Sequence, residues 1–179
     1  MKTYANPYLV KFAEVLLEKV DKKDFLAGVV GQNIVLEGLA FSVFEMMHAS
    51  AQTDNQKWAH TLSGTIADER RHVGFGENRI GSLIKQFPEQ KSAIEKMQKD
   101  MTGHMLATFA WSFGQDQKTV ENVREMRKSS GKESHAMYHG VDLNQASSAE
   151  IEKVLADTVI HEFKTRLARV GLEYQSPAA

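Results

Sequence analysis

The chain contains no cysteine, and this absence removes several classes of functional site at once. Disulfide scaffolds, cysteine-ligated zinc, iron–sulfur clusters and thiol nucleophiles all need a sulfur atom that the sequence does not supply. Any metal ion bound by the side chains of this protein must therefore be held by histidine, aspartate and glutamate.

An excess of charge of either sign is also missing. Twenty-two lysines and arginines stand against 23 aspartates and glutamates, which gives a net charge of −1. Proteins that bind nucleic acid or an anionic membrane usually have a basic excess, so we expect neither partner. The first residues are polar and lack the apolar stretch of a secretory signal, and we therefore expect a cytoplasmic protein.

Charged residues are almost absent from one segment. Between Phe25 and Phe44 the only charged side chain is Glu37, and the 20 residues approach the length of a membrane span. A carboxylate at the centre of a lipid-exposed helix costs about 2.5–3.5 kcal/mol. We therefore interpret this segment as a helix buried on several sides within a helical bundle.

The rest of the sequence has helical periodicity and no convincing strand alternation. We expect a single all-α domain over residues 1–179. The predicted helices cover residues 7–20, 24–51, 56–87, 89–113, 119–128 and 147–171, with a turn at 52–56 and a long loop at 129–146. Asp24 is a suitable N-cap for the second helix, Pro88 ends the third, and Ser147 with Glu150 forms a capping box before the last.

Glu37 needs a partner inside such a bundle. A buried carboxylate must be paired, protonated or bound to a cation, because desolvation of an isolated ion is costly. In a hairpin of the second and third predicted helices, Glu37 lies level with Glu69 and His72, which project from one helix face. One carboxylate and a Glu-x-x-His pair on the next helix form half of the ligand set of a di-metal carboxylate bundle. These donors suit iron or manganese.

Two segments, Val35–Phe41 and Asp68–Gly76, resemble the second half of the ferritin-like di-iron carboxylate superfamily. The likeness is greatest to the ribonucleotide-reductase small-subunit-like and aminobenzoate N-oxygenase-like oxidases, and it covers about residues 25–85. It implies a ferritin-like helical bundle with additional C-terminal helices. It also implies a two-metal iron site, with manganese as a possible substitute, whose ligands are Glu37, Glu69 and His72. The residue at the Asp68 position in that superfamily hydrogen-bonds a metal-bound histidine and orients its ring.

Only half of the superfamily's ligand set is evident in this chain. The usual pattern has two carboxylate helices and two Glu-x-x-His helices, whereas no second set precedes Glu37. Three explanations stay open: a homodimer supplies two half-sites around a two-fold axis, a related polypeptide supplies the other half, or an N-terminal half is absent.

Two competing interpretations concern the same helices. Glu45 and His48 form another Glu-x-x-His, which the hairpin sets opposite His60 near the turn, so a second or alternate metal site is an alternative. Glu37 could instead form a buried salt bridge to Arg70 or Arg71, and the pair on the third helix could be an exposed helical pair.

The preferred function is an oxygen-dependent di-metal oxidase or oxygenase that acts on a small organic substrate. We expect Phe41 and Phe44, one and two turns beyond Glu37, to line an apolar substrate pocket. Two alternatives are a ferroxidase that stores or detoxifies iron and a metal-free helical interaction protein. We favour an enzyme, a di-iron-type oxidoreductase.

Overall fold

The computed structural model describes residues 5–129 and 135–176, and from residue 113 to 129 it describes mainly the backbone. The expected all-α architecture is confirmed. The elements are α1 (Pro7–Asp21), α2 (Phe25–Val29), the π-helix η2 (Val30–Leu36), α3 (Glu37–Asp54), α4 (Gln56–Gln86), the 3-10 turn η3 (Pro88–Gln90), α5 (Lys91–Ser129), β1 (Met137–Tyr138), β2 (Val141–Asp142) and α6 (Ser148–Arg169).

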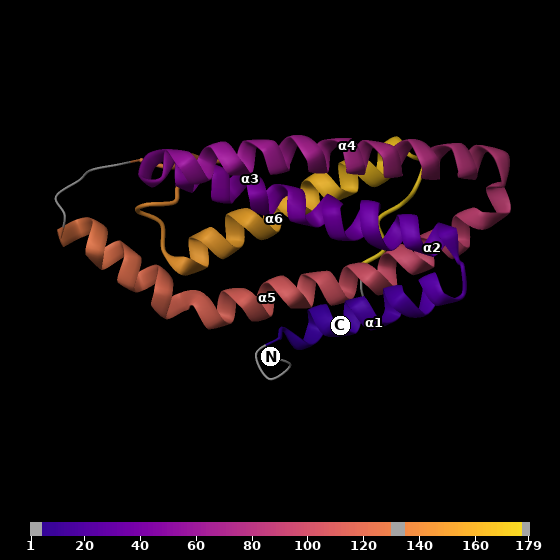
Figure 1. Ribbon diagram of the computed structural model, residues 1–179, viewed down its shortest axis with the longest axis horizontal. Coiled ribbons are helices and arrows are strands. Elements are labelled where there is room, and N and C mark those ends of the chain that lie inside the picture. Colours follow the sequence, from indigo (N-terminus) through magenta and orange to yellow (C-terminus); the bar gives the residue numbers. More distant parts are fainter. Residues whose placement is uncertain (1–4, 130–134, 177–179) are drawn as a thin grey trace.

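The helices form an elongated bundle (Figure 1). Helices α3 and α4 run antiparallel along its long axis, with α6 packed against them. Helices α5 and α1 lie together along the opposite edge, next to η2. This arrangement leaves the α3–α4 hairpin with one side against α6 and the other side facing outward.

Side-chain caps fix where the N-terminal helices begin. The side chain of Asn6 accepts hydrogen bonds from the backbone of Tyr8 and Leu9, so that α1 begins at Pro7. Asp24 accepts from the backbone of Ala27 and begins α2, which confirms the predicted cap.

The turn between α3 and α4 is shorter than the predicted segment 52–56. Asn55 alone interrupts the helices, and its side chain accepts a hydrogen bond from the backbone of Trp58. One residue can therefore end α3 and cap α4 at the same time, which sequence composition did not reveal.

The prediction of two helices between residues 89 and 128 is wrong. Helix α5 runs without interruption from Lys91 to Ser129, through Gly114. A glycine inside a helix costs only about 1 kcal/mol relative to alanine, which is a small term in a helix of 39 residues.

The predicted long loop at 129–146 contains a short hairpin. Its residues 130–134 lie outside the described part of the chain, and β1 pairs with β2 in an antiparallel register. His139 and Gly140 have positive φ values of 44° and 82°, as a tight two-residue hairpin turn requires. Tyr138 Oη donates a hydrogen bond to the carbonyl oxygen of Ser42 (3.1 Å), which fixes the hairpin to α3.

The C-terminal helix and the core agree with the sequence. The predicted capping box of Ser147 and Glu150 begins α6. One apolar cluster draws on α1 to α6, and its buried members are Phe12, Val29, Val30, Ile34, Val35, Leu39, Ile80, Ile94, Met101, Met105, Leu155, Val159, Phe163, Leu167 and Leu172.

The continuous helix from Phe25 to Asp54 is long and apolar enough to cross a membrane by length and composition. Within its most apolar window, 61% of the residues are buried against the rest of the protein. Packing against other helices therefore accounts for its apolar composition, as the single carboxylate at Glu37 led us to expect.

Candidate metal centre

The helix that carries Glu37 changes its winding immediately before this residue. Helix α2 passes into the π-helix at Val30, and α-helical winding resumes at Glu37. Short π segments inside α-helices have wider turns and are frequent at functional sites. The sequence did not predict this π-helix. The surrounding run from Phe25 to Phe44 is mostly apolar, so it has no polar–apolar period from which a change in residues per turn could be recognised.

Two amide side chains from η2 hold the carboxylate of Glu37. Gln32 Nε2 donates a hydrogen bond to Glu37 Oε1 (3.1 Å), and Asn33 Nδ2 donates one to Glu37 Oε2 (2.7 Å). The wide π turn allows residues four and five positions before Glu37 to reach it from the same side. The Glu37 side chain is only 11% exposed, so these bonds replace the water that it loses on folding.

The alternative of a salt bridge from Glu37 to Arg70 or Arg71 is wrong. Arg71 forms an ion pair with Asp68 on the protein surface, and the Cζ atom of Arg70 lies 5.7 Å from the ring centroid of Phe41. Asp68, which the resemblance implies as the partner of a metal-bound histidine, is thus engaged by Arg71. Glu37 is satisfied by two neutral amides instead of an arginine.

Glu69 and His72 of α4 complete a group of three potential ligands. His72 Nδ1 lies 3.5 Å from Glu37 Oε1 and 3.5 Å from Glu69 Oε2. One ligand atom from each of the three residues lies within 4.8 Å of the others. The hairpin register expected from the sequence therefore brings these three side chains together.

One oxygen of this group lacks a hydrogen bond. Glu69 Oε2 is buried and has no hydrogen-bond partner among the described residues. Such an atom loses its hydration and has only His72 Nδ1 nearby, at 3.5 Å, and a bound cation would supply a partner for both groups. Two carboxylates and one imidazole form a donor set that fits Fe²⁺ or Mn²⁺, while Gln32 and Asn33 would fix the orientation of Glu37.

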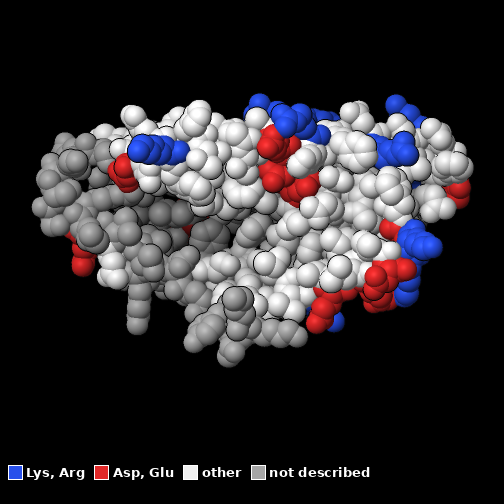
Figure 2. All heavy atoms as spheres, in the orientation of Figure 1, with Lys and Arg blue, Asp and Glu red and all other residues white. Residues whose placement is uncertain are grey.

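The group opens toward the outer side of the hairpin. The side chain of His72 is 54% exposed, whereas that of Glu69 is 20% exposed. Figure 2 shows acidic side chains beside basic ones near the middle of its upper edge, with further basic side chains to the left and right. The candidate centre is therefore reached from solvent through the imidazole of His72.

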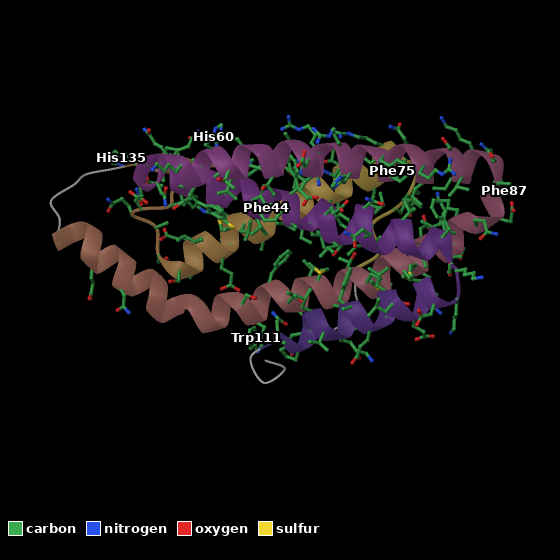
Figure 3. The ribbon with its side chains drawn as sticks, in the orientation of Figure 1. Phe44, His60, Phe75, Phe87, Trp111 and His135 are labelled. Carbon is green, nitrogen blue, oxygen red and sulfur yellow. The ribbon has the colours of Figure 1, made fainter. Side chains whose placement is uncertain are left out.

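The second Glu-x-x-His does not form a comparable cluster. His48 Nε2 lies 3.0 Å from Ser63 Oγ, and His60 projects from α4 away from α3 (Figure 3). Among the described residues, the only group of three or more potential metal ligands is Glu37, Glu69 and His72. An alternate metal site at Glu45, His48 and His60 is therefore not supported.

The two phenylalanines predicted to line one pocket have different surroundings. Phe44 packs against a small cluster near the hairpin turn, which contains Ala51, Ala59 and Leu62. Phe41 instead lines a cavity of about 700 Å³ on the α6 side, here called the inner groove. Its other lining residues include Glu45, Arg70, Val73, His161 and Arg166.

The inner groove contains charged residues that the sequence did not single out. Arg166 Nη1 donates to the carbonyl oxygen of Gly38 (2.6 Å), and its Nη2 donates to Glu162 Oε2 (3.2 Å). Glu162 Oε2 also accepts a hydrogen bond from Ser42 Oγ (3.0 Å). The spacing of Glu162 and Arg166 by four residues on the last predicted helix was the one available sequence signal.

Burial and neighbouring charges shift the pKa values of three side chains on the inner side of the hairpin. Burial raises the pKa of Glu45, and the nearby Glu162 raises it further. Burial lowers the pKa of the Arg166 guanidinium. For Tyr138, burial followed by Glu45 and Glu162 raises the pKa to about 12. These shifts follow from charges brought together in a partly dry groove.

A scan against protein-family models and searches of the curated proteins and of the solved structures find no match to this chain. The likeness to the ferritin-like di-iron superfamily therefore remains a resemblance of two segments, and the function depends on the side-chain geometry described above.

Proposed function

We propose that this chain is an oxygen-dependent di-metal carboxylate oxidase or oxygenase, with iron or manganese held by Glu37, Glu69 and His72. The observation that carries the proposal is the buried Glu69 Oε2, which has no hydrogen-bond partner in residues 5–129 and 135–176 and lies 3.5 Å from His72 Nδ1. Redox-active ions in such carboxylate sites supply electrons to dioxygen, while the protein controls access and orientation.

The surrounding side chains support this role by fixing the ligands. Gln32 and Asn33 hold both oxygens of Glu37, so this carboxylate is oriented before any ion binds. His72 turns Nδ1 toward both carboxylates, and ligation through this atom requires the ring proton to lie on Nε2. Because these side chains are already oriented, they lose less conformational entropy when an ion binds.

The inner groove supports a small organic molecule as the substrate. Its lining includes Phe41 and Val73, which follow the ligands Glu37 and Glu69 by one helical turn on their respective helices. A cavity of about 700 Å³ with an aromatic ring and a few charged groups has the size and composition of a small-molecule site. We propose that the substrate binds there, one helical turn beyond Glu37 and Glu69 and on the side of the hairpin opposite the opening at His72.

Metal content tests the proposal directly. Protein loaded anaerobically with Fe²⁺ or Mn²⁺ and then desalted should retain about one ion per chain, because two such ligand sets hold two ions. Glu69→Ala should lose the ion, whereas Glu77→Ala, two turns further along α4, should retain it. Negligible metal in the unaltered protein, or equal metal in Glu69→Ala, would contradict the proposal.

A ferroxidase is the second candidate, and the exposure of His72 favours it. An opening to solvent at a 54% exposed imidazole would admit ferrous ions as the substrate. A ferroxidase should consume oxygen with Fe²⁺ alone over many turnovers, whereas an oxygenase should stop after the resident ions are oxidised. Assembly size gives a second criterion, since iron storage needs a shell of many subunits.

A further inference from the structure

The α3–α4 hairpin leaves one side of its candidate centre uncovered by the described residues. On the proposed function, the ligands of one chain are two carboxylates and one imidazole. Two divalent ions need about four carboxylates for neutrality, and known di-metal bundles use four carboxylates with two histidines. One chain therefore provides half of the charge and half of the donors.

We propose that a second copy of this chain packs against the outer side of α4 and completes the centre with its own Glu37, Glu69 and His72. This inference rests on the proposed function, because the shared centre is its reason. A two-fold axis doubles the ligand set, and the exposed aromatic residues of α4 give a second copy a surface to pack against.

The outer side of α4 has the residue spacing of a helix-packing seam. The outer seam consists of residues separated alternately by three and four positions, namely Trp58, Thr61, Thr65, Asp68, His72 and Phe75. This spacing is the pattern by which one helix packs against another. His72 belongs to the seam, so a helix docked along it would cover the candidate centre.

The outer seam is exposed in the single chain although it carries large apolar groups. Phe75 is 54% exposed and Trp58 is 44% exposed. Met47 of α3, near the hairpin turn, is 36% exposed. Phe75 lies one helical turn from His72, and exposed aromatic residues are typical anchors of a protein interface.

The charges of this side favour a self-complementary contact. No aspartate, glutamate, lysine or arginine occurs from Trp58 to Ala67, so little desolvation of charge opposes docking there. The charged pair of the seam region is Asp68 with Arg71, one acid and one base on the same surface. A two-fold axis near these residues brings each acid close to the partner's base, whereas a surface of one sign would repel its own copy.

Charge reversal on the outer seam tests the interface. Sedimentation velocity should give a dimer for the unaltered protein after metal removal with a chelator. Phe75→Glu should weaken the dimer by at least about 30-fold, the loss typical of an interface anchor, with unchanged helical circular dichroism. Phe87→Glu is the matched control, because Phe87 is 47% exposed but lies beyond the end of α4, and it should remain dimeric.

Electron paramagnetic resonance of Mn²⁺-loaded protein gives a readout independent of activity. The unaltered dimer should show a spin-coupled pair of ions, and Phe75→Glu should show isolated ions or none. A chain that binds metal as a monomer would overturn the interface and leave the proposed function standing. A chain that binds no metal but dissociates on Phe75→Glu would contradict the proposed function and support the interface. A dimer that survives Phe75→Glu would overturn the inference.

Discussion

The two sides of the α3–α4 hairpin carry similar charged groups but satisfy them differently. On the inner side, Glu162 accepts hydrogen bonds from Ser42 and Arg166, and Arg166 also donates to the carbonyl of Gly38. On the outer side, two amides hold Glu37, and Glu69 Oε2 has no hydrogen-bond partner in the described part of the chain.

This difference separates a structural cluster from a candidate ligand site. A guanidinium between helices neutralises a carboxylate permanently and fixes the packing of α6 against α3. Neutral amides orient a carboxylate but leave its negative charge available to a cation. The α3–α4 hairpin thus has a neutralised pair on its inner side, Glu162 with Arg166, here called the closed set. On its outer side Glu37 and Glu69 have no arginine or lysine partner among the described residues, and they are here called the open set.

The largest expected effect concerns the closed set. Arg166→Ala should lower the free energy of unfolding by about 1.5–3 kcal/mol, because it removes the charge-assisted hydrogen bonds to the partly buried Glu162 and to the Gly38 carbonyl. Urea denaturation followed by circular dichroism measures the change. Arg169→Ala, at an exposed position three residues later, should stay within about 0.5 kcal/mol of the unaltered protein. A similar small effect for Arg166→Ala would remove the distinction between the two sides.

Removal of charge from the open set should affect metal affinity far more than stability. Glu37→Gln keeps the shape of the side chain but lacks the anion, and one of its two acceptor oxygens becomes an amide donor. We expect it to weaken Mn²⁺ or Fe²⁺ binding by more than about 100-fold, beyond the loss seen when a ligand's supporting residue is removed. The metal-free variant should be about as stable as the metal-free parent, because the amide of Gln32 or Asn33 can rotate and present its oxygen to the new donor. Calorimetric titration gives the affinity, and retained binding would show that Glu37 is not a ligand.

Two glycines of α4 test whether packing around Asn33 supports the outer side of the hairpin. A Cβ atom on Gly76 would lie 2.6 Å from Asn33 Cβ, whereas one on Gly74 meets nothing within 4 Å. Gly76→Ala should cost about 1–3 kcal/mol of stability and also weaken metal binding, because Asn33 orients Glu37. Gly74→Ala should stabilise the protein by about 0.5–1 kcal/mol through helix propensity. Thermal unfolding of both variants checks this, and equal melting temperatures would contradict it.

The smallest expected effect is the pH dependence of Glu45. Burial and Glu162 raise its pKa in the folded protein, so the folded state binds this proton more tightly than the unfolded chain does. Its contribution to stability is greatest below the unfolded pKa and is lost as pH rises through the folded pKa.

Glu45→Gln should therefore raise the melting temperature at pH 7 but not at pH 4. Because Glu45 is only partly buried, the gain should be below about 1 kcal/mol, or at most about 2–4 °C. Differential scanning calorimetry at the two pH values measures it. A fall in melting temperature at pH 7 would show that Glu45 is stabilised by the groove as an anion.

Local sequence signals predicted the elements that depend on single residues. Asp24 caps α2 and Ser147 forms the capping box of α6, as the sequence predicted. The helix after the hairpin turn was expected at 56–87 and extends from Gln56 to Gln86. The predicted break at Gly114 was wrong, because the helix propensity of one residue is a small term in a helix of 39 residues.

The composition and spacing of the sequence determined that a metal site here must use carboxylates and imidazoles, and that Glu37, Glu69 and His72 can meet across one hairpin. Only the tertiary structure decided that two amides of a π-helix orient Glu37 and that Glu69 Oε2 is buried with no hydrogen bond from any residue that the structure describes. It also decided that Phe41 faces α6, while Phe44 packs near the hairpin turn. Spacing along a helix fixes which face a residue occupies, but burial and hydrogen-bond partners depend on what the other helices bring to that face.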